Sequence, residues 1–319
     1  MMLKKYILLF VTLFFSGCVS HNYELKDDLP DNDVENKDVS SKYESIENIK
    51  KSEPKYIKTY IHIESYDVFI ESFFGIQFNF FDCRSNEEIE QDVEYLEKVF
   101  SDMNIHLNVQ SVEYIKPEDK EITKLSDLDL YRRKSISKDE PNALHIYYLF
   151  SHGTMPDFVG CSSFPWNASN CIFVMGMLAS KATLAHEFGH YLGLYHTFQP
   201  DGDYVSDTKD VDWNQNKDKP INEIIGDPAT DVDYDNIMNY SLSSNQKLTN
   251  VQIQRAYYYL INHRKEQLSV RKENYNLHQI LIDKSEKRLQ KKIDTLHKSN
   301  PRFQFDLKSD LNDPAPSSF

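Results

Sequence analysis

The stretch that decides the fold is residues 186–196, which read His-Glu-Phe-Gly-His-Tyr-Leu-Gly-Leu-Tyr-His. His186 and His190 are four residues apart, so a helix places both imidazoles on one face, where they can bind the same metal ion. Gly193 tolerates a positive φ, which lets the chain leave the helix and bring back His196 as a third ligand. Three protein ligands leave a coordination position for water, which is typical of a catalytic rather than a structural zinc site.

The residues around these histidines support the same interpretation. Glu187 lies beside the first ligand, where its carboxylate can reach a metal-bound water without occupying the metal. Leu184, Phe188 and Tyr191 form an apolar stripe at i, i+4 and i+7, and Ser180 can cap the helix. The shorter two-histidine pattern occurs by chance. The extended pattern fixes five positions, and its chance frequency is on the order of one in ten million per start site.

Length and charge set the class of protein. At 319 residues the chain can hold one sizeable catalytic domain with extensions. The net charge is −14 and the pI about 5.2, which disfavours a nucleic-acid partner and is compatible with cation binding.

The N-terminus is typical of a targeting segment. Two lysines precede an apolar run over residues 6–15, which is too short to span a bilayer and ends in Ser16-Gly17-Cys18. This pattern resembles a bacterial lipoprotein signal, so we predict a signal peptide over residues 1–17 and an acylated Cys18. The protein would then be extracytoplasmic and anchored to a bacterial membrane by lipid. The alternative is an ordinary cleaved secretory signal.

The rest of the chain divides by composition. Residues 18–55 are polar and acidic, which predicts a disordered tether. Residues 56–264 contain strand and helix patterns, which predict an α+β catalytic domain. Its twisted mixed sheet would carry a backing helix and the active-site helix, above an irregular lower subdomain. Residues 265–319 are rich in lysine and glutamate, which predicts a helical appendage with a frayed tail.

Within the catalytic domain the elements can be placed individually. Residues 56–64 alternate as a strand, and the aromatic-rich residues 66–82 are interpreted as an inserted hairpin or edge segment. Ser85 and Glu88 form a capping box that begins a helix reaching Ser101. Further strands are expected at residues 105–114, 143–150, 158–164 and 172–175, and further helices from Thr249 and over residues 274–298.

Two cysteines are candidates for a disulfide. Cys161 and Cys171 are separated by nine residues on either side of Pro165, a spacing that fits a bridge across a hairpin in an oxidising compartment. The alternative is two small buried thiols, which we also expect for Cys83.

An acidic loop follows the third histidine. Residues 198–236 lack periodicity and contain repeated aspartates, which can bind calcium and thereby order the loop, or can form a solvated surface. Met238 comes shortly after this loop. Paired with the metal motif upstream, it is a candidate for a methionine turn beneath the ligands.

With these residues in hand, the chain resembles the pappalysin-type (M43-like) metzincins over residues 56–262. The resemblance is densest at residues 183–198, continues through residues 202–208 and 236–241, and ends in Leu248-Thr249-x-x-Gln252-x-x-Arg255. It implies a metzincin-like fold and a zinc endopeptidase that hydrolyses proteins or peptides.

The resemblance also implies roles for particular residues. The zinc ligands would be His186, His190 and His196. Glu187 would be the general base and acid, Met238 the Met-turn residue, and Tyr240 the tyrosine near the metal. Asp203, Asp207 and Thr208 fall in a segment associated with calcium. The alternative from another class is a non-catalytic surface lipoprotein that binds host or envelope proteins on the same scaffold. The intact Glu187 argues against it, because a binding module needs no base.

Overall fold

A computed structural model describes residues 42–72, 75–117, 128, 140–150, 158–167, 169–199, 202–209, 233–240, 245–271 and 276–299. The chain divides into two compact units, Met1–Tyr275 and Asn276–Phe319. The predicted lipoprotein signal, Cys18 and most of the acidic loop lie outside the described residues. No helix in the described ranges is both long enough and apolar enough to cross a bilayer.

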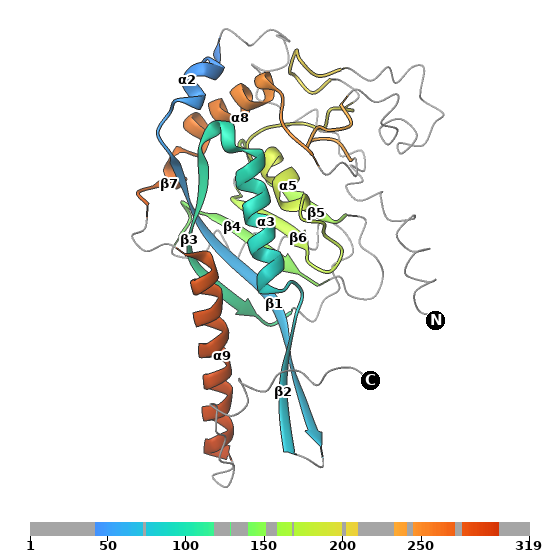
Figure 1. Cartoon of the computed structure of the whole chain (residues 1–319), viewed down its shortest axis with the longest axis vertical. Coiled ribbons are helices and arrows are strands. Elements are labelled where there is room, and N and C mark those ends of the chain that lie inside the picture. The colour runs from blue at the N-terminus through green and yellow to red at the C-terminus, as the bar shows by residue number, and fades with distance from the viewer. Residues whose placement is uncertain are drawn as a thin grey trace, which may run out of the picture. The chain divides into compact units, whose positions relative to one another are not determined.

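The first unit is built on a seven-stranded sheet with both parallel and antiparallel pairs (Figure 1). Its strands are β1 (Lys55–Ser72), β2 (Gly75–Asp82), β3 (Ile105–Ile115), β4 (Leu144–Leu149), β5 (Gly160–Ser162), β6 (Cys171–Met175) and β7 (Leu268–Ser269). The order is β2-β1-β4-β6-β5, and β3 and β7 also pair with β1. The strands β1, β3, β4 and β6 run parallel, whereas β2, β5 and β7 are antiparallel to their partners. The predicted α+β fold with a mixed sheet is confirmed.

The long strand β1 serves two parts of the molecule. Residues 55–64 pair with β3 and residues 59–63 with β4, whereas residues 65–72 pair with β2 as a hairpin. The hairpin predicted over residues 66–82 is therefore present. The first residues of β1 also receive β7, where Tyr56 lies opposite Ser269 and Ile57 opposite Leu268. Because β7 completes this sheet, the first unit extends beyond the predicted boundary at residue 264.

Two helices, α3 (Asn86–Val99) and α5 (Thr183–Tyr191), cover one face of the sheet and pack against each other (Figure 1). The predicted capping box is present at the start of α3, where Glu88 N donates to Ser85 Oγ and Ser85 N donates to the Glu88 carboxylate. The 3-10 helix η3 (Ser101–Met103) follows α3. The predicted cap of α5 was misplaced, because Ser180 Oγ accepts from Ala182 N in the turn before the helix.

The N-terminal boundary was also predicted wrongly. Residues 42–55, assigned to the tether, contain α2 (Ile46–Lys50), with Ser45 as its cap and Ile49 fully buried. This segment packs on α8 (Asn250–His263): the Tyr43 and Tyr258 rings lie 5.5 Å apart, and Gln254 Nε2 donates to Glu44 O at 2.8 Å. One buried apolar side chain, one ring contact and one hydrogen bond hold a segment whose composition is otherwise polar.

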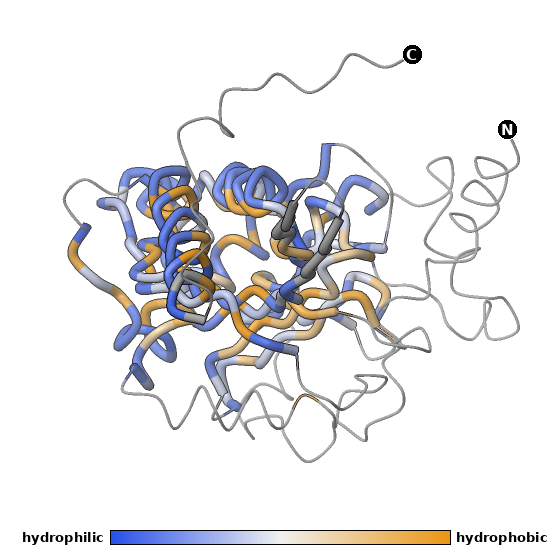
Figure 2. Tube along the Cα trace, turned by 90° about the horizontal axis from the view of Figure 1, so that it is seen from below, coloured by the Kyte–Doolittle hydropathy of each residue, from blue (hydrophilic) through white to orange (hydrophobic). Residues whose placement is uncertain are grey.

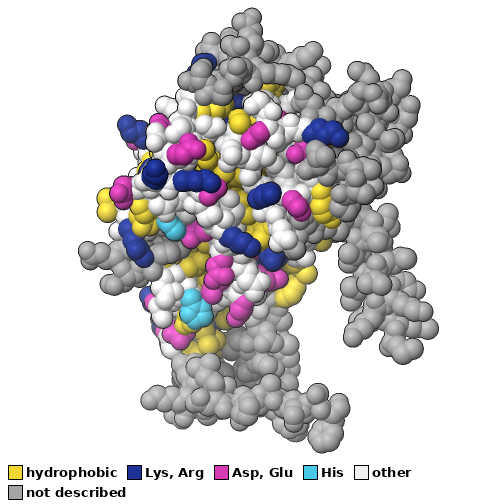
Figure 3. Space-filling model, turned by 45° about the horizontal axis from the view of Figure 1, so that its top comes forward, with side chains coloured by type: hydrophobic (Ala, Val, Ile, Leu, Met, Phe, Trp, Pro, Cys, Tyr) yellow, Lys and Arg dark blue, Asp and Glu magenta, His cyan; other side chains and the backbone are white. Residues whose placement is uncertain are grey.

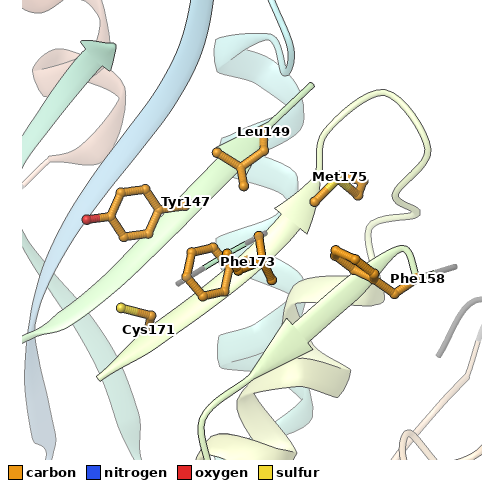
Figure 4. Close-up of a cluster of buried hydrophobic side chains, with 7 residues drawn as sticks. Tyr147, Leu149, Phe158, Cys171, Phe173 and Met175 are labelled. Carbon is orange, nitrogen blue, oxygen red and sulfur yellow. The ribbon is translucent and has the colours of Figure 1, made fainter. Parts of the chain in front are cut away.

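The core lies on both faces of the sheet. All residues of β4 and β6 are buried, as expected for strands covered on two sides. Tyr148 faces α3, since its hydroxyl donates to Asp92. The alternate residues of these strands on the other face are Tyr147, Leu149, Cys171, Phe173 and Met175, and they form an apolar cluster with Leu128 and Phe158 (Figure 4). Apolar residues are concentrated in the strands and on the inward sides of the helices (Figure 2).

The remaining elements are short or separate. The 3-10 helix η5 (Lys265–Gln267) links α8 to β7. The second unit contains α9 (Leu277–Ser299), where the sequence predicts a helix. On the face shown in Figure 3, the lysine and arginine side chains of the described residues are interspersed with aspartate and glutamate.

Candidate metal centre

The three predicted ligands are brought together at the end of α5. His186 and His190 lie on the helix, and Gly193, at φ 83°, turns the chain so that His196 returns to them. A Cβ at position 193 would lie 2.6 Å from the ring of Tyr259, so glycine is required by space as well as by φ. Arg255, buried in α8, donates from Nε to Gly193 O at 2.9 Å. The turn is therefore fixed from outside the helix.

The ligand atoms of the three histidines converge. His196 Nε2 lies 3.1 Å from His186 Nε2 and 3.0 Å from His190 Nε2. In the described part of the chain, these three residues form the group whose spacing could hold a metal ion. The opposite ring nitrogens face carbonyls: His186 Nδ1 lies 2.7 Å from Ile237 O and His190 Nδ1 2.8 Å from Leu194 O.

This arrangement fits a cation. A carbonyl only accepts hydrogen bonds, so Nδ1 of His186 and of His190 carries the proton and each Nε2 presents a lone pair. A proton on His196 Nε2 can satisfy one of these lone pairs but not both. Burial lowers the pKa of His186 to about 4 and that of His190 to about 3, so both imidazoles are in the neutral, metal-binding form at pH 7. Three neutral imidazoles are a donor set that zinc accepts.

Glu187 follows the first of these histidines on α5 and is a buried carboxyl group. Its side chain is 2% exposed, and its Oε2 has no hydrogen-bond partner among the described residues. Burial raises the pKa of Glu187 to about 8. A buried carboxylate oxygen without a donor is costly unless a bound molecule supplies one, and water at a neighbouring metal ion is such a donor.

The floor of the site is formed by the segment around Met238. A Cβ at Gly189 would collide with Met238 Sδ, so the helix and this methionine are in direct contact. Thr197 N donates to Met238 O at 3.2 Å, which links the segment after the third histidine to this turn. The Tyr240 ring lies 4.8 Å from the His196 ring and 5.7 Å from the His186 ring, so the structure places Tyr240 at the site.

The residues predicted for calcium form hydrogen bonds with other groups of the protein. Asp203 accepts from the Thr208 hydroxyl at 2.7 and 2.8 Å, and Asp207 accepts from Thr249 Oγ1 at 2.6 Å and Val251 N at 2.9 Å. Asp207 thus binds the N-terminus of α8, where its negative charge is favourable. The bonds of Asp207 connect residues 202–209 to α8, whereas those between Asp203 and Thr208 lie within the segment, and calcium binding here stays a prediction.

The predicted disulfide is wrong. Both Cys161 and Cys171 are thiols in the structure, as is Cys83. The register of β5 and β6 places Cys161 opposite Phe173, and Ser163 N donates to Cys171 O. The two cysteines are therefore diagonal neighbours, about 7–8 Å apart for such positions, beyond the reach of a disulfide.

Sequence reasoning missed two supporting residues. A Cβ at Gly160 in β5 would overlap the Glu187 side chain. Arg264, 2% exposed, stacks over the Tyr191 ring at 3.9 Å and donates to the carbonyls of Ser163 and Phe164. Both act across long sequence separations, and neither belongs to a local pattern that periodicity or spacing could have identified.

Comparisons with known proteins agree with this site. The Peptidase M43 family, described as pregnancy-associated plasma protein-A, matches residues 170–260, and the reprolysin-like metallopeptidase family M12B matches residues 86–197. An extracellular metalloprotease of Neurospora crassa is 28% identical over 138 residues, 38% of this chain and 47% of that protein. The matched region thus spans about half the length of this relative.

Solved structures of metalloproteases are also similar. Mirolysin in complex with compound 9 aligns with a TM-score of 0.47 at 16% identity, over 70% of this chain and all of that chain. Metalloproteinase-II from Bacteroides fragilis aligns with a TM-score of 0.33 at 14% identity, over 48% of this chain and 46% of that chain. The family matches and the fungal relative support a metzincin-like relationship.

Proposed function

We propose that this protein is a zinc-dependent endopeptidase that hydrolyses peptide bonds in proteins. The observation that carries the proposal is the convergence of three neutral imidazoles, two of them on the helix that also carries Glu187, whose buried Oε2 has no hydrogen-bond partner among the described residues. The metalloprotease families that match the chain support the same reaction class.

The residues of the site have complementary roles in this reaction. His186, His190 and His196 would hold zinc, which when bound supplies Lewis acidity and makes water a stronger acid. Glu187 takes the proton of the attacking water and passes it to the leaving amine. Tyr240 lies beside the His196 ring, where its hydroxyl can donate a hydrogen bond to the negative charge that develops on the substrate carbonyl oxygen.

The buried state of Glu187 favours an enzyme over a binding scaffold. Burying this carboxyl group raises its pKa to about 8, which shows that its ionised form is destabilised by its surroundings. A scaffold that only binds other proteins gains nothing from that cost.

The test is digestion of casein by the purified protein, with zinc content measured on the same samples. Wild type should cleave casein, and cleavage should stop when the metal is chelated. Glu187→Gln should retain zinc and lose about 1,000-fold or more of the activity, because an amide cannot accept the proton. Glu94→Gln on the exposed side of α3 is the matched control and should behave as wild type. Equal activity of Glu187→Gln and wild type contradicts the mechanism.

We further propose that the enzyme is exported and anchored by lipid at Cys18. The apolar run before Ser16-Gly17-Cys18 supports this, and the fungal relative is described as extracellular. Mass spectrometry of the membrane fraction should find acylated Cys18 at the mature N-terminus, and Cys18→Ala should release the protein. An unmodified, soluble wild-type product contradicts the anchor.

A further inference from the structure

We infer that Gly160 is a positioning residue for Glu187: the absence of a side chain at position 160 sets where the carboxylate of the base lies. This inference rests on the proposed function, because it assigns to β5 a part in the reaction.

The contact between the two residues is close and specific. A Cβ at position 160 would lie 2.5 Å from Oε1, 2.7 Å from Cγ and 2.8 Å from Cδ of Glu187. These three nearest atoms all belong to the outer part of one side chain, and none belongs to the backbone. The carboxylate arm of Glu187 therefore lies directly against the Cα of Gly160. Gly160 itself is buried.

The strand β5 is held on its β6 side. Gly160 lies opposite Val174 in the antiparallel pair with β6. On one side of it, Val159 O accepts from Met175 N at 2.8 Å, and on the other, Ser163 N donates to Cys171 O at 3.2 Å. Moving the backbone of residue 160 would break this ladder.

Arg264 holds the end of the same strand against the metal helix. Its Nη2 donates to Ser163 O at 2.9 Å and to Phe164 O at 3.0 Å, while its guanidinium stacks on the ring of Tyr191, the last residue of α5. The buried guanidinium of Arg264 thus links β5 to α5, so that β5 cannot move away from the helix. A side chain at position 160 must therefore displace the carboxylate of Glu187.

The other closely packed glycines meet different atoms. A Cβ at Gly176 would meet the backbone carbonyl of Cys83, one at Gly189 would meet Met238, and one at Gly193 would meet Tyr259. Those contacts serve packing and backbone conformation. Among these four glycines, Gly160 is the one whose added Cβ would fall on the base.

The first experiment is Gly160→Ala in the full-length protein, assayed for casein or peptide hydrolysis, zinc content and melting temperature. We expect kcat to fall about 100-fold, the loss that a displacement of about 1 Å produces at a catalytic group. KM, zinc content and melting temperature should stay near the wild-type values. Cys161→Ala, a truncation on the opposite face of β5, is the control for a general disturbance of the strand and should retain the activity.

The second experiment is rescue by a shorter base. Glu187→Asp withdraws the carboxylate by one methylene from the space that the alanine Cβ fills, so the two substitutions should be coupled. Gly160→Ala with Glu187→Asp should lose at least tenfold less kcat than the product of the two single losses. A purely structural role of Gly160 predicts no such rescue.

The outcomes separate the two proposals. An inactive wild type overturns both, and so does a fully active Glu187→Gln. If wild type is active and Glu187→Gln is not, a fully active Gly160→Ala overturns the inference about Gly160 alone. Loss of zinc or of the folded state in Gly160→Ala, or a double variant without rescue, also overturns it.

Discussion

The helices α3 and α5 lie against each other on the same face of the sheet, yet they are stabilised in different ways. The 14 residues of α3 begin with a capping box and bury one side of the helix. The nine residues of α5 have no side-chain cap, and every residue from Leu184 to Tyr191 is buried. A helix this short is marginal on its own, so the conformation of α5 depends on what surrounds it.

The two helices also bury polar groups differently. In α3 the buried Asp92 pairs with Arg84 at 2.7 Å and accepts from the Tyr148 hydroxyl. In α5 the buried polar groups are two imidazoles, which converge with that of His196 where a cation fits, and the carboxyl group of Glu187, whose Oε2 has no hydrogen-bond partner among the described residues. Arg84 connects the two cases, because it also donates to Gly176 O and Ala179 O in the segment that leads into α5. The arginine that pairs with α3 thus also holds the segment that leads into α5, the helix that carries the metal-binding histidines.

Removal of the metal should produce the largest difference in behaviour between α3 and α5. In His196→Ala we expect no retained zinc and no stabilisation by added zinc, which for wild type is about 4 kcal/mol at a thousandfold excess over Kd. Hydrogen exchange should show faster exchange of the α5 amides on chelation of wild type and little change in α3. Equal acceleration in both helices would contradict their different dependence on the metal.

Arg84→Met should cause the next largest effect. It leaves Asp92 buried without its cation, which destabilises proteins by about 3–5 kcal/mol. Urea unfolding measures the loss, and Arg84→Met with Asp92→Asn should be less destabilised than Arg84→Met alone. If the double variant is the weaker one, the ion pair is not the reason for the loss.

The buried base should give a smaller, pH-dependent effect in the metal-free protein. Burial raises the pKa of Glu187 from 4.5 to about 8, so the folded state binds its proton more tightly than the unfolded state. The contribution of Glu187 to wild-type stability should therefore fall as the pH rises from 4.5 to 8, and Glu187→Gln should remove the part of the pH dependence that comes from this carboxyl group.

The buried histidines change the stability with pH in the opposite direction. Burial lowers the pKa of His186 from 6.5 to about 4, so the stability of both proteins should fall as the pH drops below 6.5. Thermal melting of the chelated proteins between pH 4 and 9 measures both limbs. Identical curves for wild type and Glu187→Gln above pH 5 would contradict the assignment.

The smallest effect should come from the cap of α3. Ser85→Ala removes the acceptor of Glu88 N and should cost about 1 kcal/mol of stability. Zinc content and peptide hydrolysis should not change, because α5 does not depend on this cap. Ser180→Ala, which alters the turn before α5, provides the comparison on the other helix.

The sequence predicted what is encoded locally. The spacing of His186, His190 and His196, the turn at Gly193 and the cap at Ser85 are all local patterns, and the structure contains each of them. Tyr240 was placed by the family resemblance and lies at the site.

What the sequence could not predict depends on register and on distant contacts. The disulfide prediction failed because a spacing of nine residues does not specify which β5 residue faces Cys171. The prediction of the tether boundary failed because Ile49 is buried and Tyr43 packs on Tyr258 of α8, some 200 residues away. Gly160 was missed for the same reason. Its partner Glu187 lies on another element, and the residues next to a glycine in the sequence do not indicate which distant side chain packs against its Cα.

The pairing of β7 with β1 imposes an order of events during synthesis. Tyr56 and Ser269, joined by a hydrogen bond from Ser269 Oγ to Tyr56 O, are 213 residues apart in the chain. At translation rates of about 5–20 residues per second, the ribosome needs about 10–40 s to reach the second after the first. Throughout that interval the beginning of β1 has an unpaired edge beside β4, which is a template for incorrect strand pairing. A chain that ends before residue 268 would keep that edge permanently and should aggregate more readily than the full-length protein.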